Sequence, residues 1–164
     1  MLPPKRPSET SIVMSQLMLP PDANPWGNVH GGTIMKLVDS AAGVVATRHC
    51  RSRVVTARMD EMSFLEPVFI GNVVTLKATV NDTGRTSLEV GVRVEAEDLR
   101  SGRTWHVGSA YLIFVSLDDE GHPQVVAPLL PETADERRRQ QEARERRARR
   151  TRNGGRGGPP FRGE

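Results

Sequence analysis

The sequence predicts an α+β domain in which an antiparallel sheet of five to six strands wraps around one long central helix. Two observations lead to this expectation, namely one long segment with helical apolar spacing and several strand-like runs joined by short turns. The chain has 164 residues, which corresponds to one domain with a tail. Its 37% apolar content becomes ordinary for a globular protein once the 15 glycines are added.

The central helix is expected at residues 33–50. Ile34 and Val38 belong to one stripe of apolar residues at helical spacing, and Met35 and Asp39 belong to a second. Both stripes are apolar or small apart from Asp39. A helix that is apolar on most sides is expected to be buried on most sides, and a curved sheet would supply that cover.

Strand-like runs lie on both sides of this helix. They are expected at residues 11–19, 54–65, 73–80, 87–97 and 104–117. The run at 88–95 alternates apolar with polar or small residues, as a strand with one solvent-facing side should. Because the connections after the helix are short, the last four strands are expected to form an antiparallel meander.

The two ends of the chain differ from its body in composition. Residues 1–131 carry 12 Lys and Arg and 14 Asp and Glu, whereas residues 132–164 carry 11 Arg and six Asp and Glu. We therefore divide the chain into a flexible arm (1–10), a globular domain (11–131), a basic C-terminal helix that is solvated at best (132–150) and a disordered Arg/Gly-rich tail (151–164). The acidic body gives no compositional reason to expect nucleic-acid binding.

Several classes of protein are excluded by what the sequence lacks. The single cysteine, Cys50, excludes an intrachain disulfide and a cysteine-cluster zinc site. The apolar runs are too short to span a membrane, and the N-terminus lacks the apolar core of a signal peptide, so a cytoplasmic location is expected. The sequence has no P-loop, dinucleotide-binding or HExxH motif, and we expect no metal and no cofactor.

A glycine pair, Gly31-Gly32, lies where a loop rich in turn formers enters the central helix. The first N–H groups of a helix lack internal partners and point outward with the positive end of the dipole. This is a suitable place for a carbonyl oxygen that becomes an oxyanion. A merely tight loop would explain the glycines equally well.

Asp39 is the unusual residue of the helix, since an acid in apolar surroundings costs stability unless it is paired or functional. It is either a helix-face acid that binds a nearby arginine or lies at a dimer seam, or a general base or nucleophile beside a dry pocket. It lies seven residues after Gly32, which is about 10 Å along a helix. If both act on one substrate atom, Asp39 must come from a second subunit of a homodimer.

The block Asn28-Val-His-Gly-Gly-Thr-Ile-Met-Lys, the later Asp39, and blocks at 47–50, 55–58, 64–68 and 70–71 follow one another in order. Together they resemble the hotdog-fold acyl-CoA thioesterases, and most closely the cytosolic acyl-CoA hydrolase type, over residues 11–150. The resemblance implies the hotdog fold and homodimers joined edge to edge, usually as trimers of dimers. It also implies hydrolysis of acyl-CoA to free CoA and a carboxylic acid, a reaction of fatty acid metabolism, with CoA as part of substrate and product.

Carried over by position, the resemblance implies that Asn28 and Asp39 are the catalytic pair, facing each other across the dimer. It assigns oxyanion or substrate binding to His30, Gly31 and Gly32. The residues that it places along CoA are Ala57, Arg58, Met59, Thr86, Ser87, Leu88 and Arg146. Without the resemblance, these would be ordinary residues of a strand, a hairpin turn and a solvated helix.

Two alternatives stay open. A hotdog enoyl-CoA hydratase or dehydratase would pair a catalytic histidine with an acid, and His30 is the candidate. An acyl-CoA-binding module with an RNA-binding tail would use the Arg/Gly-rich run at 152–158, although nucleic acid is an unlikely partner and no membrane partner is expected.

Overall fold

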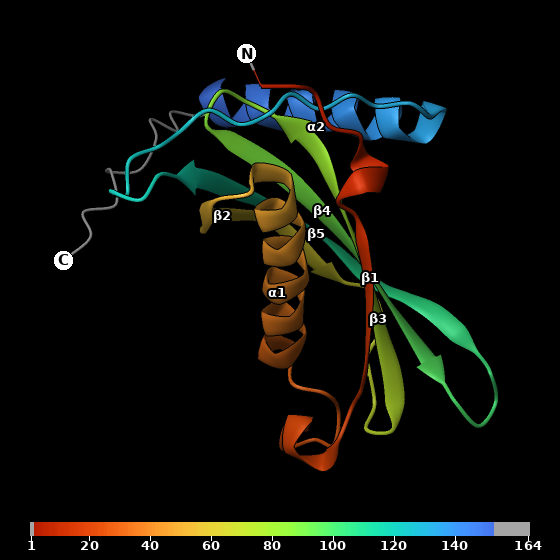
Figure 1. Ribbon diagram of the computed structural model, residues 1–164. Helices are drawn as coiled ribbons and strands as arrows, with labels where there is room; N and C mark the ends of the chain where they lie inside the picture. The colour runs from red at the N-terminus through yellow and green to blue at the C-terminus, as the bar shows by residue number, and fades with distance from the viewer. Residues whose placement is uncertain (1, 153–164) are drawn as a thin grey trace.

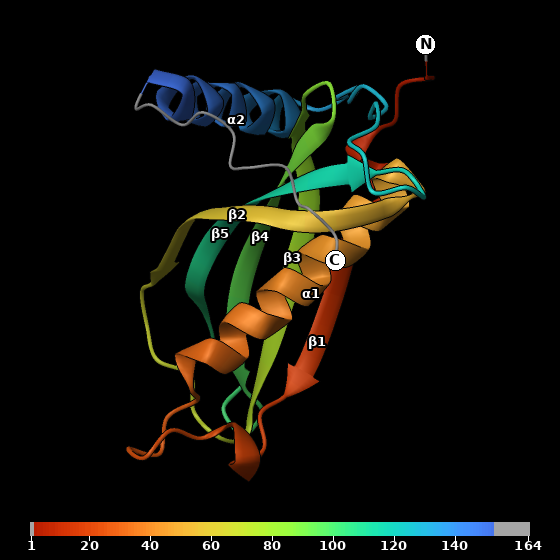
Figure 2. The same ribbon diagram turned by 90° about the vertical axis from the view of Figure 1, so that its left-hand side faces the viewer.

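The protein was analysed as a computed structural model, which describes residues 2–152. The elements in chain order are η1 (Pro7–Glu9), β1 (Ile12–Leu17), η2 (Pro20–Asp22), α1 (Gly31–Cys50), β2 (Arg53–Phe64), β3 (Asn72–Thr83), β4 (Ser87–Asp98), β5 (Thr104–Leu117) and α2 (Ala134–Arg152). The five strands form one antiparallel sheet that curves around α1, as Figures 1 and 2 show. The predicted α+β class, with a sheet around a long central helix and a second helix near the C-terminus, is confirmed.

The strand order is β1-β3-β4-β5-β2, so only β3, β4 and β5 form a meander. The prediction that all four later strands form a meander is therefore wrong, because β2 does not pair with β3. It pairs with β5 and forms one edge of the sheet. Three strand spacings separate β2 from β3, or about 14 Å. The intervening segment at 65–71 can extend over more than about 20 Å, so a short connection is long enough to cross the end of the sheet.

The core lies between α1 and the concave face of the sheet. The fully buried side chains that meet there come from one face of α1 and from alternate positions of β3, β4 and β5; among them are Ile34, Val38, Val45, Val74, Leu76, Val90, Leu112 and Phe114. Within the single chain α1 is buried on this one face only. Met35 and Val44, both 42% exposed, lie with Asp39 on its outer face, so the expected burial on most sides is not found in one chain.

The helix begins at Gly31, two residues earlier than the spacing of apolar residues predicts. His30 precedes it as the N-cap, and its Nδ1 accepts a hydrogen bond from the Gly32 N–H at 3.0 Å. Because this bond satisfies one of the free donors of the first turn, the two glycines are drawn into the helix despite their low helix propensity.

The N-terminal arm, which the sequence predicts to be flexible, is held by hydrogen bonds to the segment after β5. The Lys5 N–H donates to the Pro128 carbonyl at 2.9 Å, and the Leu130 N–H donates to the Lys5 carbonyl at 2.8 Å. Thr10, at the end of η1, is 2% exposed. The arm is thus tied to the segment that follows β5, which sequence reading does not reveal because the partner lies more than a hundred residues away.

The prediction that the C-terminal helix is solvated is wrong as well. Glu89 and Tyr111 lie at alternate positions to the core residues of β4 and β5, so their side chains leave the convex face of the sheet. Both contact Arg146 of α2, which places this helix on the face opposite α1 (Figures 1 and 2). The predicted tail at 151–164 begins inside α2, and its residues 153–164 lie outside the described part of the chain.

Candidate functional site

The loop that leads into α1 is closed by its own asparagine. The Asn24 Oδ1 accepts hydrogen bonds from the N–H groups of Trp26 at 3.0 Å and Asn28 at 3.1 Å. The Asn24 N–H in turn donates to the Asn28 carbonyl at 2.7 Å. This Asx turn fixes the loop through the carbonyl half of the Asn24 side chain and leaves its amide nitrogen for another partner.

Among the described residues, the two asparagines differ in how their side chains are engaged. Asn28 contributes its backbone to the turn, and its side chain makes no hydrogen bond within residues 2–152. Both residues line one cavity of about 320 Å³ between this loop and the start of α1. Either amide can therefore reach a molecule bound in the cavity, but only Asn24 is held by its own hydrogen bonds.

The three residues predicted for the oxyanion do not all offer free donors. The His30 N–H donates to the Asp22 carbonyl at 2.8 Å, and the Gly32 N–H is occupied by the His30 ring. The Gly31 N–H forms no hydrogen bond in the described part of the chain, and Gly31 lines the cavity. It stands at the positive end of the α1 dipole, so it is the donor best suited to a developing oxyanion.

This cavity of about 320 Å³ lies between this loop, the start of α1 and the segment that follows β2. Asn24, Asn28 and Gly31 contribute polar groups to its lining. Its remaining walls are apolar apart from Glu66, and consist of Val29, Ile34, Phe64, Leu65, Pro67 and Val68. A concave, mostly apolar site with a few converging polar groups is the usual form of a small-molecule site.

Asp39 lies eight residues after Gly31, more than two turns further along α1, and outside the lining of this cavity. Its carboxylate is exposed in the single chain, and its Oδ1 accepts a hydrogen bond from the Thr56 hydroxyl of β2 at 2.8 Å. β2 is an edge strand of the sheet, so Asp39 stands beside the edge at which another chain could add. One chain therefore does not bring the acid and the cavity together.

The residues predicted to bind CoA fall into different surroundings. Ala57 and Arg58 are exposed and Met59 is half-buried on β2, where the pairing with β5 is irregular. The Arg58 guanidinium pairs with Asp60 at 2.5 Å. The strand is thus open to a ligand from its solvent side.

The predicted hairpin residues are mostly engaged within the chain. The carbonyl groups of Thr86 and Ser87 accept hydrogen bonds from Ser116 and Gly84, and the Leu88 side chain is fully buried. Leu88 is therefore a core residue at the base of the turn, and only its backbone could line a pantetheine slot.

Arg146, which the resemblance assigns to CoA binding, is buried against the sheet. Its guanidinium donates to both Glu89 carboxylate oxygens, at 2.7 and 3.2 Å, and lies 3.7 Å above the Tyr111 ring. Burial opposes the charged form, but the Glu89 hydrogen bonds and charge outweigh it and raise the pKa of Arg146. The buried pair joins α2 to the sheet, on the face away from α1 and from the 320 Å³ cavity.

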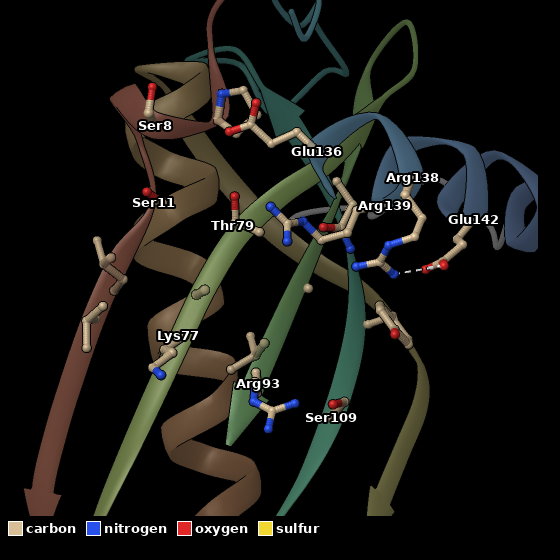
Figure 3. Close-up of a pocket in the computed structure, with 18 residues that line it drawn as sticks. Ser8, Ser11, Lys77, Thr79, Arg93, Ser109, Glu136, Arg138, Arg139 and Glu142 are labelled. Atoms are coloured by element: carbon tan, nitrogen blue, oxygen red, sulfur yellow. Dashed lines mark hydrogen bonds and ion pairs between the residues drawn. The ribbon is translucent and has the colours of Figure 1, made fainter. Parts of the chain in front are cut away.

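Figure 3 shows a larger cavity of about 620 Å³, which lies on the convex face of the sheet between the N-terminal arm and α2. Four cationic side chains line it, but Lys77 and Arg93 pair with Glu95, and Arg138 pairs with Glu142. None of the residues that the sequence suggested lines it. Its charges are largely neutralised within the chain, which makes this cavity a weaker candidate for the functional site.

Asn24, Thr56 and Phe64 are residues of the candidate site that the sequence analysis did not single out. Asn24 lies in a run of turn formers and could have been found by asking which side chain closes the turn. Thr56 lies 17 positions from Asp39 on another element, so only the folded chain reveals their contact.

The residues that the structure describes hold no group of three or more His, Cys, Asp or Glu side chains that could bind a metal ion. In the same part of the chain, neither helix has the length and apolar character needed to cross a membrane.

Comparison with known proteins places this geometry in a family. Residues 27–102 match the model of the thioesterase superfamily. The chain is 39% identical over 137 residues to the mouse cytosolic acyl coenzyme A thioester hydrolase, covering 82% of this chain but only 35% of the mouse protein. It therefore spans about a third of the mammalian relatives. It is 37% identical to a Bacillus subtilis protein named as an uncharacterized acyl-CoA thioester hydrolase and covers 74% of that protein.

Solved structures agree over nearly the whole chain. A hexameric acyl-CoA thioesterase superposes with a TM-score of 0.90 at 32% identity, over 93% of this chain and 97% of the other. An acyl-CoA hydrolase from Staphylococcus aureus in complex with butyryl coenzyme A superposes with a TM-score of 0.86 at 33% identity, over 92% of each chain. Other structures of that hydrolase carry alanine in place of an aspartate, an asparagine or a threonine.

Proposed function

Because the chain belongs to the thioesterase superfamily, we propose that it hydrolyses acyl-CoA thioesters to free CoA and a carboxylic acid. The observation that carries this proposal is that one helix, α1, has a cavity at its first turn and an exposed carboxylate, Asp39, further along. The cavity holds a free Gly31 N–H and two asparagine amides, and Asp39 lies beside an exposed sheet edge. The substrates named for the relatives supply the chemical class, acyl-CoA.

The three variants of the S. aureus hydrolase support a specific choice of residues. In that protein the replaced asparagine lies 15 positions before the replaced aspartate, and the threonine lies 17 positions after it. Asn24, Asp39 and Thr56 have the same two spacings here, whereas Asn28 lies only 11 positions before Asp39. We therefore infer that Asn24 is the catalytic amide, and that the predicted Asn28 serves mainly to hold the loop around it.

The reaction follows from these groups. The thioester carbonyl accepts from the Gly31 N–H, which stabilises the negative charge that develops on its oxygen. Asp39 removes a proton from a water molecule, whose oxygen attacks the carbonyl carbon. The carbon–sulfur bond then breaks, the electron pair leaves with the CoA sulfur, and the sulfur takes up the proton held by Asp39. The Asn24 amide orients the water or the carbonyl.

A second subunit completes the site in this proposal. Asp39 and Gly31 of one chain lie too far apart along α1 to reach one carbonyl, as the helical rise of about 1.5 Å per residue requires. Pairing of two copies along β2 would bring the Asp39 of one chain toward the cavity of the other and would cover the outer face of α1. Two such copies carry two complete sites, and the hexameric relative is consistent with three dimers in one assembly.

CoA would then run from the cavity over the open side of β2, past Ala57, Arg58 and Met59, toward the hairpin at Thr86 and Ser87. Arg58 is the nearest cation on this path, although it is shared with Asp60. Arg146 would have to leave Glu89 to reach a phosphate, so we assign it to the fold instead. A cytosolic location, as the names of the mammalian relatives state for those proteins, accompanies this proposal.

The test is release of free CoA from a series of acyl-CoA esters by the purified chain. We expect turnover by the wild type, and an Asp39→Asn variant with unchanged thermal stability to lose at least about 100-fold in kcat, since general base catalysis contributes about 10²–10⁴-fold. Full turnover by Asp39→Asn, or none by the wild type, would overturn the proposal. Hydration of an enoyl-CoA by the wild type would favour the hydratase instead.

A second comparison separates the two asparagines. Asn24→Asp keeps the oxygen that accepts from Trp26 and Asn28, so the turn should persist while the catalytic amide is lost. Asn28→Ala removes a side chain that has no partner within residues 2–152 and keeps the backbone of the turn. We expect Asn24→Asp to lose more kcat than Asn28→Ala. The reverse order would restore Asn28 as the catalytic amide.

A further inference from the structure

The 320 Å³ cavity has a wall whose position is fixed by its neighbours. The Val29 N–H donates to the Val68 carbonyl at 2.8 Å, and the Leu65 N–H donates to the Val107 carbonyl at 2.7 Å. The Trp105 indole donates to the Pro67 carbonyl at 3.2 Å. The segment that forms the apolar wall is therefore tied to the loop on one side and to β5 on the other.

β2 and β5 approach unusually closely just before this wall begins. A Cβ on Gly108 would lie 1.9 Å from the Ser63 carbonyl oxygen, so only glycine fits there. This close approach at Ser63 directly precedes Phe64, the last residue of β2, whose side chain lines the cavity. The position of this apolar wall is thus fixed by backbone contacts.

Phe64 limits the cavity toward the helix. Its ring Cζ lies 3.7 Å from the place that a Cβ on Gly31 would take, so the ring packs against the residue that offers the free N–H. Phe64 is 50% exposed in the single chain. Phe64 therefore lines the cavity beside the Gly31 N–H and is not part of the buried core.

We propose that this cavity holds the acyl group and that Phe64 restricts the substrates to short acyl chains. The proposal rests on the proposed thioesterase activity and adds its substrate class. With the carbonyl at Gly31, the first carbons of the acyl group would lie against Phe64 and the apolar side chains of Val29, Ile34 and Val68. The part of this cavity that one chain forms, about 320 Å³, is at the low end of the volumes of ligand sites, which favours a short chain beside the thioester.

The charges around the cavity agree with an uncharged acyl group. Glu66 is the one ionisable side chain in the lining, and its partner, Arg103, lies 3.5 Å away at the rim. A dicarboxylic acyl group would place a second carboxylate near Glu66 and among apolar side chains, which is costly. The cavity therefore favours acyl chains that carry no second charge.

The test is a profile of kcat/KM over acetyl-, butyryl-, hexanoyl-, octanoyl- and lauroyl-CoA. We expect the wild type to prefer the short esters. Phe64→Ala should raise octanoyl relative to butyryl turnover by about tenfold or more, since a change of a methylene or more in an apolar pocket is worth about 10–200-fold. Phe64→Trp should shift the preference the other way.

Phe69→Ala is the matched control, because Phe69 is a similarly exposed aromatic residue that does not line the cavity. Its profile should match that of the wild type. An unchanged profile in both Phe64 variants, or an equal loss for all chain lengths, would overturn the assignment of the acyl site while the wild type still hydrolyses acyl-CoA. Absence of wild-type turnover on every ester would instead overturn the proposed function and, with it, this inference.

Discussion

The Thr56 hydroxyl donates a hydrogen bond of 2.8 Å to the Asp39 carboxylate, and it joins the central helix to the edge strand of the sheet. Asp39 is exposed in one chain, so nothing else in the described residues fixes its side-chain direction. Thr56 is therefore a positioning residue that aims the carboxylate along the edge where the proposed second subunit lies.

This contact yields the first prediction. Thr56→Val removes the donor at nearly constant size, and we expect kcat to fall about 10- to 100-fold, since a hydrogen bond to a charged group is worth about 1.5–3 kcal/mol. KM should change little. Thr56→Ser restores the hydroxyl and should recover most of the activity. Equal losses in the Val and Ser variants would contradict a role of the hydroxyl.

The buried pair of Arg146 and Glu89 gives a prediction on stability. Arg146→Met removes the cation and leaves the Glu89 carboxylate 1% exposed without its main partner. Breaking a buried pair in this way costs about 3–5 kcal/mol, which urea unfolding would measure. The double variant Arg146→Met, Glu89→Leu should regain much of that loss because neither charge of this pair stays buried.

The same variants decide between two roles for Arg146. If Arg146 belongs to the fold, KM for acyl-CoA should be unchanged in the double variant. A KM increase with unaltered stability would instead show that Arg146 binds the nucleotide of CoA, as the family resemblance implies.

How far the fold follows from the sequence is clear from the two helices. Apolar residues at helical spacing predict α1, and its buried face is the one that contains Ile34 and Val38. α2 has hardly any apolar face, with Ala143 its one buried apolar residue, so periodicity cannot reveal that it packs on a sheet. Its arginines meet Asp60, Asp82 and Glu89, and pairs so distant in sequence are visible only after folding.

The candidate site is predictable to a similar degree. The glycine pair and Asp39 stand out by their residue types and lie at the ends of one short stretch of helix. The proposed choice of Asn24 over Asn28 rests on the spacing of the replaced residues in the S. aureus hydrolase. The sequence contains both asparagines in one run of turn formers, and only the fold shows that the Asn24 side chain closes the turn. The oxyanion donor depends on His30, whose ring occupies Gly32 and leaves Gly31 free.

His49 gives a prediction on pH dependence. It is fully buried at the end of α1, with Nε2 2.8 Å from the Ala127 carbonyl and Nδ1 without a partner in the described residues. Burial lowers the pKa of His49; the Ala127 hydrogen bond and Glu9 oppose this effect, and Lys5 adds to it. The folded state therefore holds the neutral ring, whereas the unfolded chain takes up a proton near the ordinary histidine pKa of about 6.5.

Because the pKa is lower in the folded state, its contribution to stability is complete above the ordinary value and is lost as the pH falls below it. We expect the free energy of unfolding of the wild type to decrease between about pH 7 and about pH 5. His49→Gln, which keeps a donor for Ala127 and does not titrate, should show a smaller decrease. Parallel curves for the two proteins would contradict the assignment to His49.

The composite site makes the strongest prediction, because it concerns two chains that are each inactive. Asn24→Asp lacks the amide but keeps Asp39, and Asp39→Asn lacks the acid but keeps the cavity. When the two variants are coexpressed with different tags and assort at random, half of the dimers contain one chain of each kind, and each of these has one intact site of two. Activity should return to about a quarter of the wild-type value, and to about half in purified heterodimers. If both groups of a site came from one chain, each heterodimer would carry two damaged sites and stay inactive, so the absence of recovery in verified heterodimers would rule out a site shared between subunits.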